Sequence, residues 1–287
     1  MSSRSSAIRG VSVEDLEAWM PARGGGRRRV LVVGGNWMDH GEPVLAAIAS
    51  MYSGADEVIL AVPNKLADAA RCASPDVLVM PIPDQKLTKG AARWVLDHVP
   101  DLDAAYLGAG MKDAGGGAQL ARELSSRGAR LVLGHWLWDR ESLGQVRGSH
   151  PLLVHEGGHF ERELGAPSDA EGVRRVALEL DLVALVEGQS WVASDGREVL
   201  THPRGIRADP AGLLSVIGGI AAGLLALGMD GLRAAASAAA IAELAADSLS
   251  SRRGLHWGAS ALLEELPSIM ARFDRVEVGG GGHEPKG

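Results

Sequence analysis

The sequence predicts an α/β fold with a mostly parallel central sheet and helices on both faces. Short aliphatic runs alternate with longer stretches of helical periodicity along the 287 residues, and such alternation is typical of βαβ units. Apolar residues make up 46% of the chain, which is enough to bury a large core. Since no Pro-, Gly- and Ser-rich linker divides the middle, we expect one domain over residues 11–278, between flexible ends at 1–10 and 279–287.

The expected elements follow from this periodicity in chain order. The strands are the short aliphatic runs at 30–33, 57–61, 77–80, 104–107, 130–133, 152–154 and 182–186. The helices between them lie at 42–53, 65–72, 88–98, 116–126 and 171–180. The Asp195-Gly196 pair between two short apolar runs predicts a hairpin within 191–200. The last part of the chain is helical, at 210–228, 231–248 and 258–272.

The uncharged stretch Pro210–Met229 has two interpretations. Its length is marginal for a membrane span. However, it is rich in small residues, begins with Asp209-Pro210 and runs into the Ala-rich stretch 232–247. These features favour a helix packed tightly inside an α/β core.

Charge and cysteine content exclude several classes of protein. Basic residues number 29 and acidic residues 36, a net charge of −7, whereas nucleic-acid binding needs a basic surface. Cys72 is the only cysteine, so an intramolecular disulfide is impossible. The polar N-terminus lacks the apolar core of a signal peptide. We therefore expect a cytoplasmic protein that binds neither nucleic acid nor membranes. The histidines lack a metal-ligand spacing, so no protein-held metal site is predicted.

Several short motifs occur in an order that resembles a known family. Val30-Leu-Val-Val-Gly-Gly35 is followed by Ser53-Gly-Ala-Asp-Glu-Val58. Tyr106-Leu-Gly-Ala-Gly-Met111 resembles a Gly-Pro-Gly-Leu-Gly loop, and Val154–Arg162 resembles a Thr-Pro-His-Pro-Gly-Glu segment. Ala184-Leu-Val-Glu-Gly188 resembles a Val-Leu-Lys-Gly strand. Together these motifs resemble the NAD(P)H-hydrate dehydratases, a ribokinase-like family, over about residues 11–273.

The resemblance implies an activity, ligands and site residues. The family uses ADP or ATP, with Mg²⁺, to dehydrate hydrated NADH and NADPH in nicotinamide nucleotide repair. It forms homo-oligomers, with a tetramer among the expected states. Four residues would bind the substrate, namely His155, Gly108, Gly110 and Lys112. Four others would bind the nucleotide, namely Glu187, Gly188, Gly212 and Ser215. His155 is equally compatible with a satisfied loop histidine.

The chain departs from the family pattern at the positions that carry its chemistry. The family's Gly-x-Gly-Asp turn opens the long helix, and its Asp falls on Ser215 or, in another alignment, on Leu213. Neither residue is an acid. The family's strand Lys is Glu187 here, and an Ala near the first Gly motif is Glu42. A phosphate pocket that loses a cation and gains acids should bind anions worse.

The remaining acid near the helix start is Asp209. With Pro210 after it, Asp209 fits an N-cap better than a relocated catalytic acid. Three functions stay open. The first is a divergent dehydratase whose ordinary activity is weak or lost. The second is a non-catalytic ribokinase-fold protein that binds a ligand or forms an oligomer. The third is a sugar-type small-molecule kinase.

Overall fold

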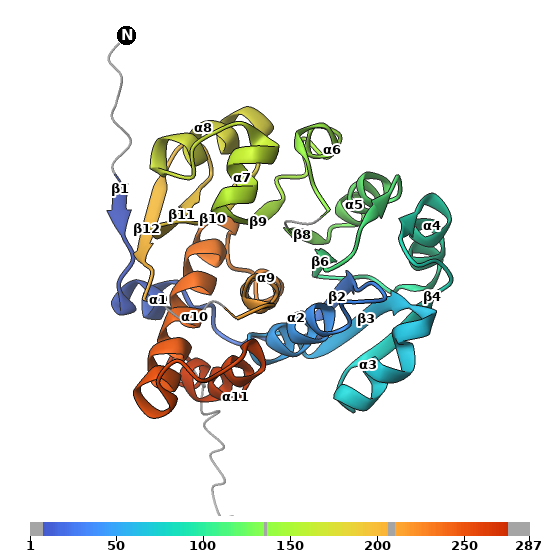
Figure 1. Cartoon of the computed structure of the whole chain (residues 1–287), viewed down its shortest axis with the longest axis horizontal. Helices are drawn as coiled ribbons and strands as arrows, with labels where there is room; N and C mark the ends of the chain where they lie inside the picture. Colours follow the sequence, from blue (N-terminus) through green and yellow to red (C-terminus); the bar gives the residue numbers. More distant parts are fainter. Residues whose placement is uncertain (1–7, 135–136, 206–209, 275–287) are drawn as a thin grey trace, which may run out of the picture.

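The computed structural model describes residues 8–134, 137–205 and 210–274, and a ten-stranded sheet forms its centre (Figure 1). The strands lie side by side in the order β1 (Ile8–Gly10), β12 (Val199–Pro203), β11 (Ser190–Ser194), β10 (Val183–Glu187), β9 (Leu152–Glu156), β8 (Arg130–Gly134), β6 (Ala104–Ala109), β2 (Arg29–Gly34), β3 (Glu57–Pro63) and β4 (Leu78–Ile82). Neighbours run parallel except where β11 pairs with β10 and β12. The predicted mostly parallel sheet is confirmed.

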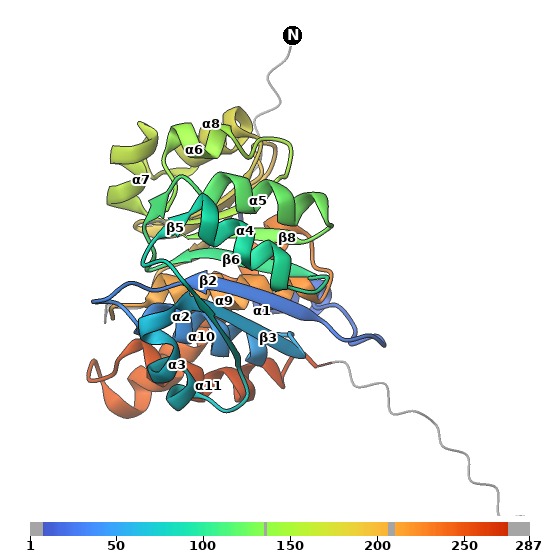
Figure 2. The ribbon, with the colours of Figure 1, turned by 90° about the vertical axis from the view of Figure 1, so that its right-hand side faces the viewer.

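Two layers of helices cover the faces of the sheet (Figure 2). One layer contains α1 (Val13–Trp19), α2 (Gly41–Tyr52), α3 (Ala67–Ala73), α9 (Leu213–Ala226), α10 (Gly231–Arg253) and α11 (Ala259–Met270). The other contains α4 (Lys89–His98), α5 (Gly117–Ser126), α6 (Arg140–Gly144), α7 (Gly157–Leu164) and α8 (Ala170–Leu180). In β2, Val30 and Val32 pack under the first layer and Leu31 and Val33 under the second. Burial on both faces explains why the strands are continuous apolar runs.

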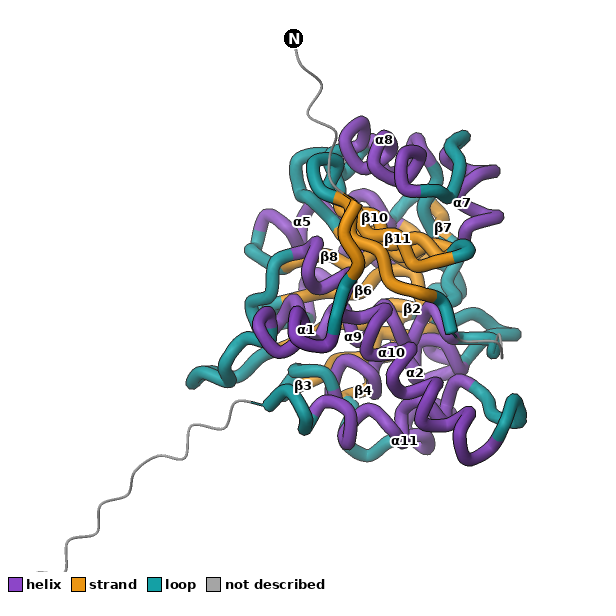
Figure 3. The backbone as a smooth tube through the Cα atoms, turned by 90° about the vertical axis from the view of Figure 1, so that its left-hand side faces the viewer, coloured by secondary structure: helices purple, strands orange, loops and turns teal. Residues whose placement is uncertain are grey.

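The hairpin predicted around Asp195-Gly196 is also observed. Strands β11 and β12 flank this turn and extend the sheet antiparallel beyond β10 (Figure 3). A 3₁₀ turn, η1 (Asn64–Leu66), precedes α3, and a separate two-stranded sheet joins β5 (Leu87–Thr88) to β7 (Asp113–Ala114).

The structure corrects the expected flexible N-terminus in its last three residues. Residues 8–10 form β1, which runs parallel to β12 with Ile8 opposite Val199. A three-residue edge strand is too short to produce a periodic signal in the sequence. The division into a domain at 11–278 stays a prediction, and the tail at 279–287 lies outside the described residues.

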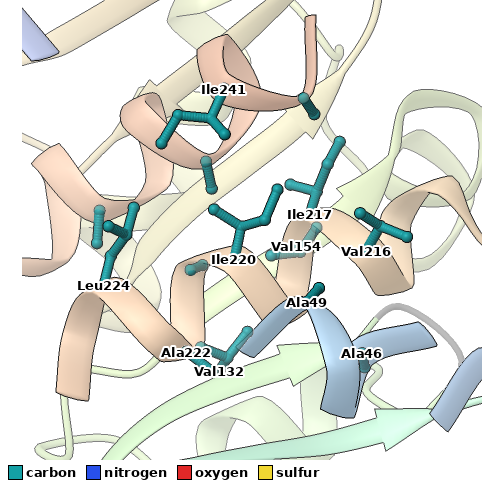
Figure 4. Packing of buried hydrophobic residues seen from close by; sticks show 14 of the residues in the cluster. Ala46, Ala49, Val132, Val154, Val216, Ile217, Ile220, Ala222, Leu224 and Ile241 are labelled. Atoms are coloured by element: carbon teal, nitrogen blue, oxygen red, sulfur yellow. The ribbon is translucent and has the colours of Figure 1, made fainter. Parts of the chain in front are cut away.

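Helix α9 is the element that the uncharged stretch forms. All of its residues, Leu213–Ala226, are buried, and it packs against α2 (Figure 4). A Cβ atom at Gly219 would lie 2.3 Å from the carbonyl oxygen of Ala46, so only glycine permits this close approach. The buried-helix interpretation is confirmed. Within the described ranges, no helix combines the length and the hydropathy that a membrane span requires.

The start of α9 differs from the prediction of 210–228. Gly212 has a φ of +89°, in the left-handed region, so the α-helix begins only at the next residue. The start of α9 lies close to α2 at this point: a Cβ atom at Gly212 would lie 2.5 Å from Cδ1 of Leu45, which belongs to α2.

Candidate active site

A pocket of about 450 Å³ opens at the carboxyl ends of β2 and β6. Parallel α/β sheets generally bind ligands at this edge. Three chain segments supply its walls: the connection from β2 into α2, the one from β4 to β5, and the one from β6 to β7. The lining residues are Asn36, Trp37, Met38, Asp39, Glu42, Gln85, Lys86, Gly110 and Lys112.

The turn after β6 forms the part of this pocket that the sequence predicts. Gly108 and Gly110 have φ values of +109° and +69°, so the predicted tight turn is present. Asn36 Nδ2 donates to the carbonyl oxygen of Gly110 at 2.6 Å. A Cβ at Gly110 would lie 2.7 Å from Asp39 Oδ2. The turn is thus fixed against the loop after β2, and the substrate-binding role of both glycines stays a prediction.

Two lysines bring positive charge to the pocket. Lys112 was expected there from the resemblance, and Lys86 joins it from the connection between β4 and β5. No motif in the sequence pointed to Lys86, because the two lysines approach only through tertiary structure. Trp37 and Met38, which are 78% and 72% exposed, add a large apolar surface to the same pocket. The pocket therefore combines cations with apolar area, as ligands with phosphate groups and flat rings require.

A carboxylate lies at the first turn of α9, although the helix itself supplies none there. Ser215 Oγ donates to Glu42 Oε2 at 2.9 Å, and Glu42 belongs to the first turn of α2. Ser215 is 1% exposed. The sequence identified Glu42 only as an added acid. The structure shows that it reaches one of the two positions where the family's Asp is expected.

Tyr106 of β6 is fully buried and its ring lies against α9, since a Cβ at Gly218 would be 2.6 Å from its ring carbon. Burial raises the pKa of its hydroxyl far above the usual value, and the charge of Glu42 raises it further, while a hydrogen bond with Ser215 opposes both. The phenol therefore stays neutral. The hydrogen bond from Ser215 thus holds the Glu42 carboxylate next to a neutral phenol.

Glu187 is compensated by a cation that the sequence did not indicate. Arg204 Nη2 lies 2.5 Å from Glu187 Oε1, and the two side chains are 24% and 10% exposed. The negative charge that Glu187 introduces in place of the family's Lys is therefore paired with a cation, and its effect on phosphate binding stays a prediction. Arg204 follows β12 directly, and its role could not be anticipated because the pairing joins segments 17 residues apart in the chain.

A second buried acid holds the chain at Gly205, shortly after β12. Glu243 of α10 is 3% exposed. Trp191 Nε1 donates to its Oε1 at 2.6 Å, and the backbone N–H of Gly205 donates to its Oε2 at 2.9 Å. The sequence gave no reason to single out Glu243 from the Ala-rich helix.

His155, by contrast, is buried away from the pocket. It is 0% exposed at the end of β9 and packs edge-on against Phe160 of α7. Its Nδ1 donates to the carbonyl oxygen of Glu156 at 3.0 Å. His155 does not line the pocket described above, and a contact with substrate stays a prediction. Gly188, also predicted from the resemblance, lies in the turn after β10 and donates its N–H to the carbonyl of Ser190 at 3.2 Å.

The burial of His155 predicts a measurable pH dependence of stability. Burial lowers the pKa of its imidazole from the ordinary value, against smaller opposing effects that include the Glu156 backbone hydrogen bond. The unfolded chain therefore binds the proton more readily, and the free energy of unfolding should fall as pH drops below about 6.5. We expect His155→Asn to reduce the difference in unfolding free energy between about pH 7.5 and 5.5. Urea unfolding at both pH values, with the exposed His98→Asn as control, measures this. An unchanged pH dependence in His155→Asn would contradict the prediction.

Asp209 was proposed from the sequence as a relocated acid, and it lies outside the described residues. Its role is left to mutation. Among the residues that the structure does describe, no three His, Cys, Asp or Glu side chains are grouped closely enough to hold a metal ion.

The sheet order, the buried helix α9 and a pocket at the carboxyl edge beside it define a ribokinase-like α/β protein. The structure is similar to that of a ribokinase-like superfamily protein from Enterococcus faecalis, with a TM-score of 0.76, 15% sequence identity, and coverage of 94% of this chain and 97% of that one. It is also similar to an ADP/ATP-dependent NAD(P)H-hydrate dehydratase from Bacillus subtilis, with a TM-score of 0.79, 18% identity, and coverage of 93% and 99%.

Sequence comparison defines the family more narrowly. The family model for NAD(P)H-hydrate dehydratase matches residues 30–268. An ADP-dependent (S)-NAD(P)H-hydrate dehydratase of Cenarchaeum symbiosum is 39% identical over 286 residues, which covers 94% of this chain and all of that protein. The chain belongs to the NAD(P)H-hydrate dehydratase family.

Proposed function

We propose that this chain is an ADP-dependent NAD(P)H-hydrate dehydratase that acts in the cytoplasm in nicotinamide nucleotide repair. One observation supports this most strongly: a carboxylate, Glu42, stands at the first turn of α9 and also lines the pocket that holds Lys86 and Lys112. The reaction needs an acid or base, cations and a phosphate-binding helix start in one place. The ADP dependence of the Cenarchaeum symbiosum relative agrees with this choice of nucleotide.

The residues at the start of α9 fit a nucleotide phosphate. The first N–H groups of a helix have no partner within the helix, and their dipole favours an anion. In α9 these groups follow Gly212, whose left-handed backbone precedes the first helical residue. Mg²⁺ usually arrives with the nucleotide and takes one or two carboxylate oxygens from the protein, which Asp39 would supply beside Glu42. The nucleotide contributes the terminal phosphate that activates the hydroxyl of the hydrated ring.

The missing helix Asp and the reversed Lys led us to expect weak or absent ordinary activity from the sequence. In the structure, Glu42 brings a carboxylate to the first turn of α9, where the family's Asp is missing. Arg204 pairs with Glu187, which replaces the family's Lys. We therefore propose that turnover is retained. Incubation of the pure protein with hydrated NADH, and with ADP, ATP or no nucleotide, tests this through the absorbance of NADH. NADH formation only with nucleotide is expected. Absence of both turnover and ADP binding in calorimetry would favour the non-catalytic alternative. Nucleotide-dependent phosphorylation of a sugar without NADH formation would favour the kinase.

Assembly as a homo-oligomer, with a tetramer as the expected state, is also a proposal, and it depends on the resemblance. The small residues of α9 and α10 do not support it, because they are used to pack these helices inside the chain. Light scattering at micromolar concentration should give a multiple of the 29.9 kDa chain mass. A mass of one chain would contradict the proposal.

A further inference from the structure

Glu42 occupies the junction between two groups of residues that the resemblance assigns to different ligands. On one side it lines the pocket with Gly110 and Lys112, which were predicted to bind the substrate. On the other side it accepts the hydrogen bond of Ser215, and its Cγ lies 4.0 Å from where a Cβ of Gly212 would be. Ser215 and Gly212 were predicted to bind the nucleotide. A group that acts on the atoms exchanged between two ligands must lie between their sites.

The backbone that carries Glu42 is held firmly. Its N–H donates to Asp39 Oδ1 at 3.2 Å in the first turn of α2. Helix α2 in turn packs against α9 at backbone distance, since a Cβ at Gly223 would lie 2.6 Å from the carbonyl oxygen of Ser50. The hydrogen bond from Ser215 Oγ then orients the side chain. Catalytic groups are generally held in this way, by packed elements and by a second set of hydrogen bonds.

We infer that Glu42 is the catalytic acid/base of this chain, and that α2 supplies the carboxylate which α9 lacks in its described first turn. The inference rests on the proposed function. The Glu42 carboxylate accepts the proton of the hydroxyl on the hydrated ring as that oxygen bonds to the terminal phosphorus of ADP. The bond from this phosphorus to the bridging oxygen breaks, and its electron pair leaves with AMP.

The second half of the reaction regenerates the reduced ring. The phosphate leaves with the electron pair of the carbon–oxygen bond, assisted by the ring nitrogen. The adjacent ring carbon loses a proton to solvent, and the double bond of NADH forms. One hydrated NADH and one ADP thus give one NADH, one AMP and one phosphate, and Glu42 releases its proton to solvent before the next cycle.

Replacement of Glu42 separates catalysis from binding. With ADP and hydrated NADH at saturation, Glu42→Gln should lower kcat by about 10²–10⁴-fold, the usual effect of losing a positioned acid or base. The Kd for ADP, measured by calorimetry, should stay unchanged or decrease, because a negative charge near the phosphates is removed. Glu42→Asp shortens the side chain but keeps the carboxylate, so its kcat should lie between those of Glu42→Gln and the unmodified protein.

A matched control is available in the same layer of helices. Glu265 of α11 also accepts from a serine hydroxyl, Ser248 Oγ, at 2.7 Å, and it does not line the pocket. Glu265→Gln should keep the kcat of the unmodified protein. Circular dichroism and thermal melting show which variants fold. Where Glu42→Gln does not fold, Glu42→Asp decides, and an unreduced kcat in that variant would overturn the inference.

The possible failures can be told apart. No NADH from the unmodified protein overturns the proposed function, and the inference with it. Turnover by the unmodified protein that Glu42→Gln leaves intact overturns the inference alone. Loss of kcat in Asp209→Asn with full activity in Glu42→Gln would also overturn it, and would assign the reaction to the relocated acid.

Discussion

Removal of both pocket lysines should raise the KM for hydrated NADH by about 10²–10⁴-fold, since each charge-assisted hydrogen bond to phosphate contributes about 1.5–3 kcal/mol. Lys86 and Lys112 enter the pocket from different connections of the chain. In the double variant Lys86→Ala/Lys112→Ala, kcat should change little, because loss of contacts made equally in the ground state and the transition state raises KM and leaves kcat unchanged.

Steady-state kinetics at two salt concentrations measure this effect. The unmodified protein should lose affinity for hydrated NADH as salt rises, and the double variant should lose less, because fewer charges remain to be screened. Lys65→Ala, which removes an exposed lysine in η1 outside the pocket, is the control. A double variant with an unchanged KM would show that the substrate binds elsewhere.

Truncation of Glu243 should lower the free energy of unfolding more than any other substitution proposed for this chain. Glu243→Ala leaves the indole N–H of Trp191 and the backbone N–H of Gly205 without the acceptors that they have now. Each unsatisfied buried donor costs about 1–3 kcal/mol, and the cavity adds to this, so we expect a loss of about 2–5 kcal/mol in the free energy of unfolding. Glu243→Gln keeps one carbonyl oxygen and should lose about half as much.

Denaturant unfolding of the three proteins tests this order. The loss should come with weaker ADP binding, because Gly205 precedes in the chain the helix start at which we propose that the phosphate binds. Equal stability of Glu243→Ala and the unmodified protein would contradict the prediction.

The sequence predicted the sheet and most of the long helices because their signals are local. Strands such as β2 and β10 are apolar runs buried on both faces, and α8 has a clear polar face. Three helices were missed, α1, α6 and α7, which have 7, 5 and 8 residues. Each has at most about two turns, too few to establish a 3.6-residue period.

The candidate site was less predictable because its decisive contacts join distant segments. Ser215 and Glu42 are 173 residues apart, and Trp191 and Glu243 are 52 apart. The sequence showed both an acid lost at the helix start and an acid gained at Glu42. Only the packing of α2 on α9 shows that Glu42 lies where the family's Asp is expected.

The products formed from hydrated NADH and ADP test the central claim most directly. Chromatography of the reaction of the unmodified protein should show NADH, AMP and phosphate appearing in equal amounts, with no NADH above the background rate when ADP is left out. NADH formation at the same rate with and without ADP, or no formation of NADH at all, would contradict the assignment of this chain as an ADP-dependent dehydratase.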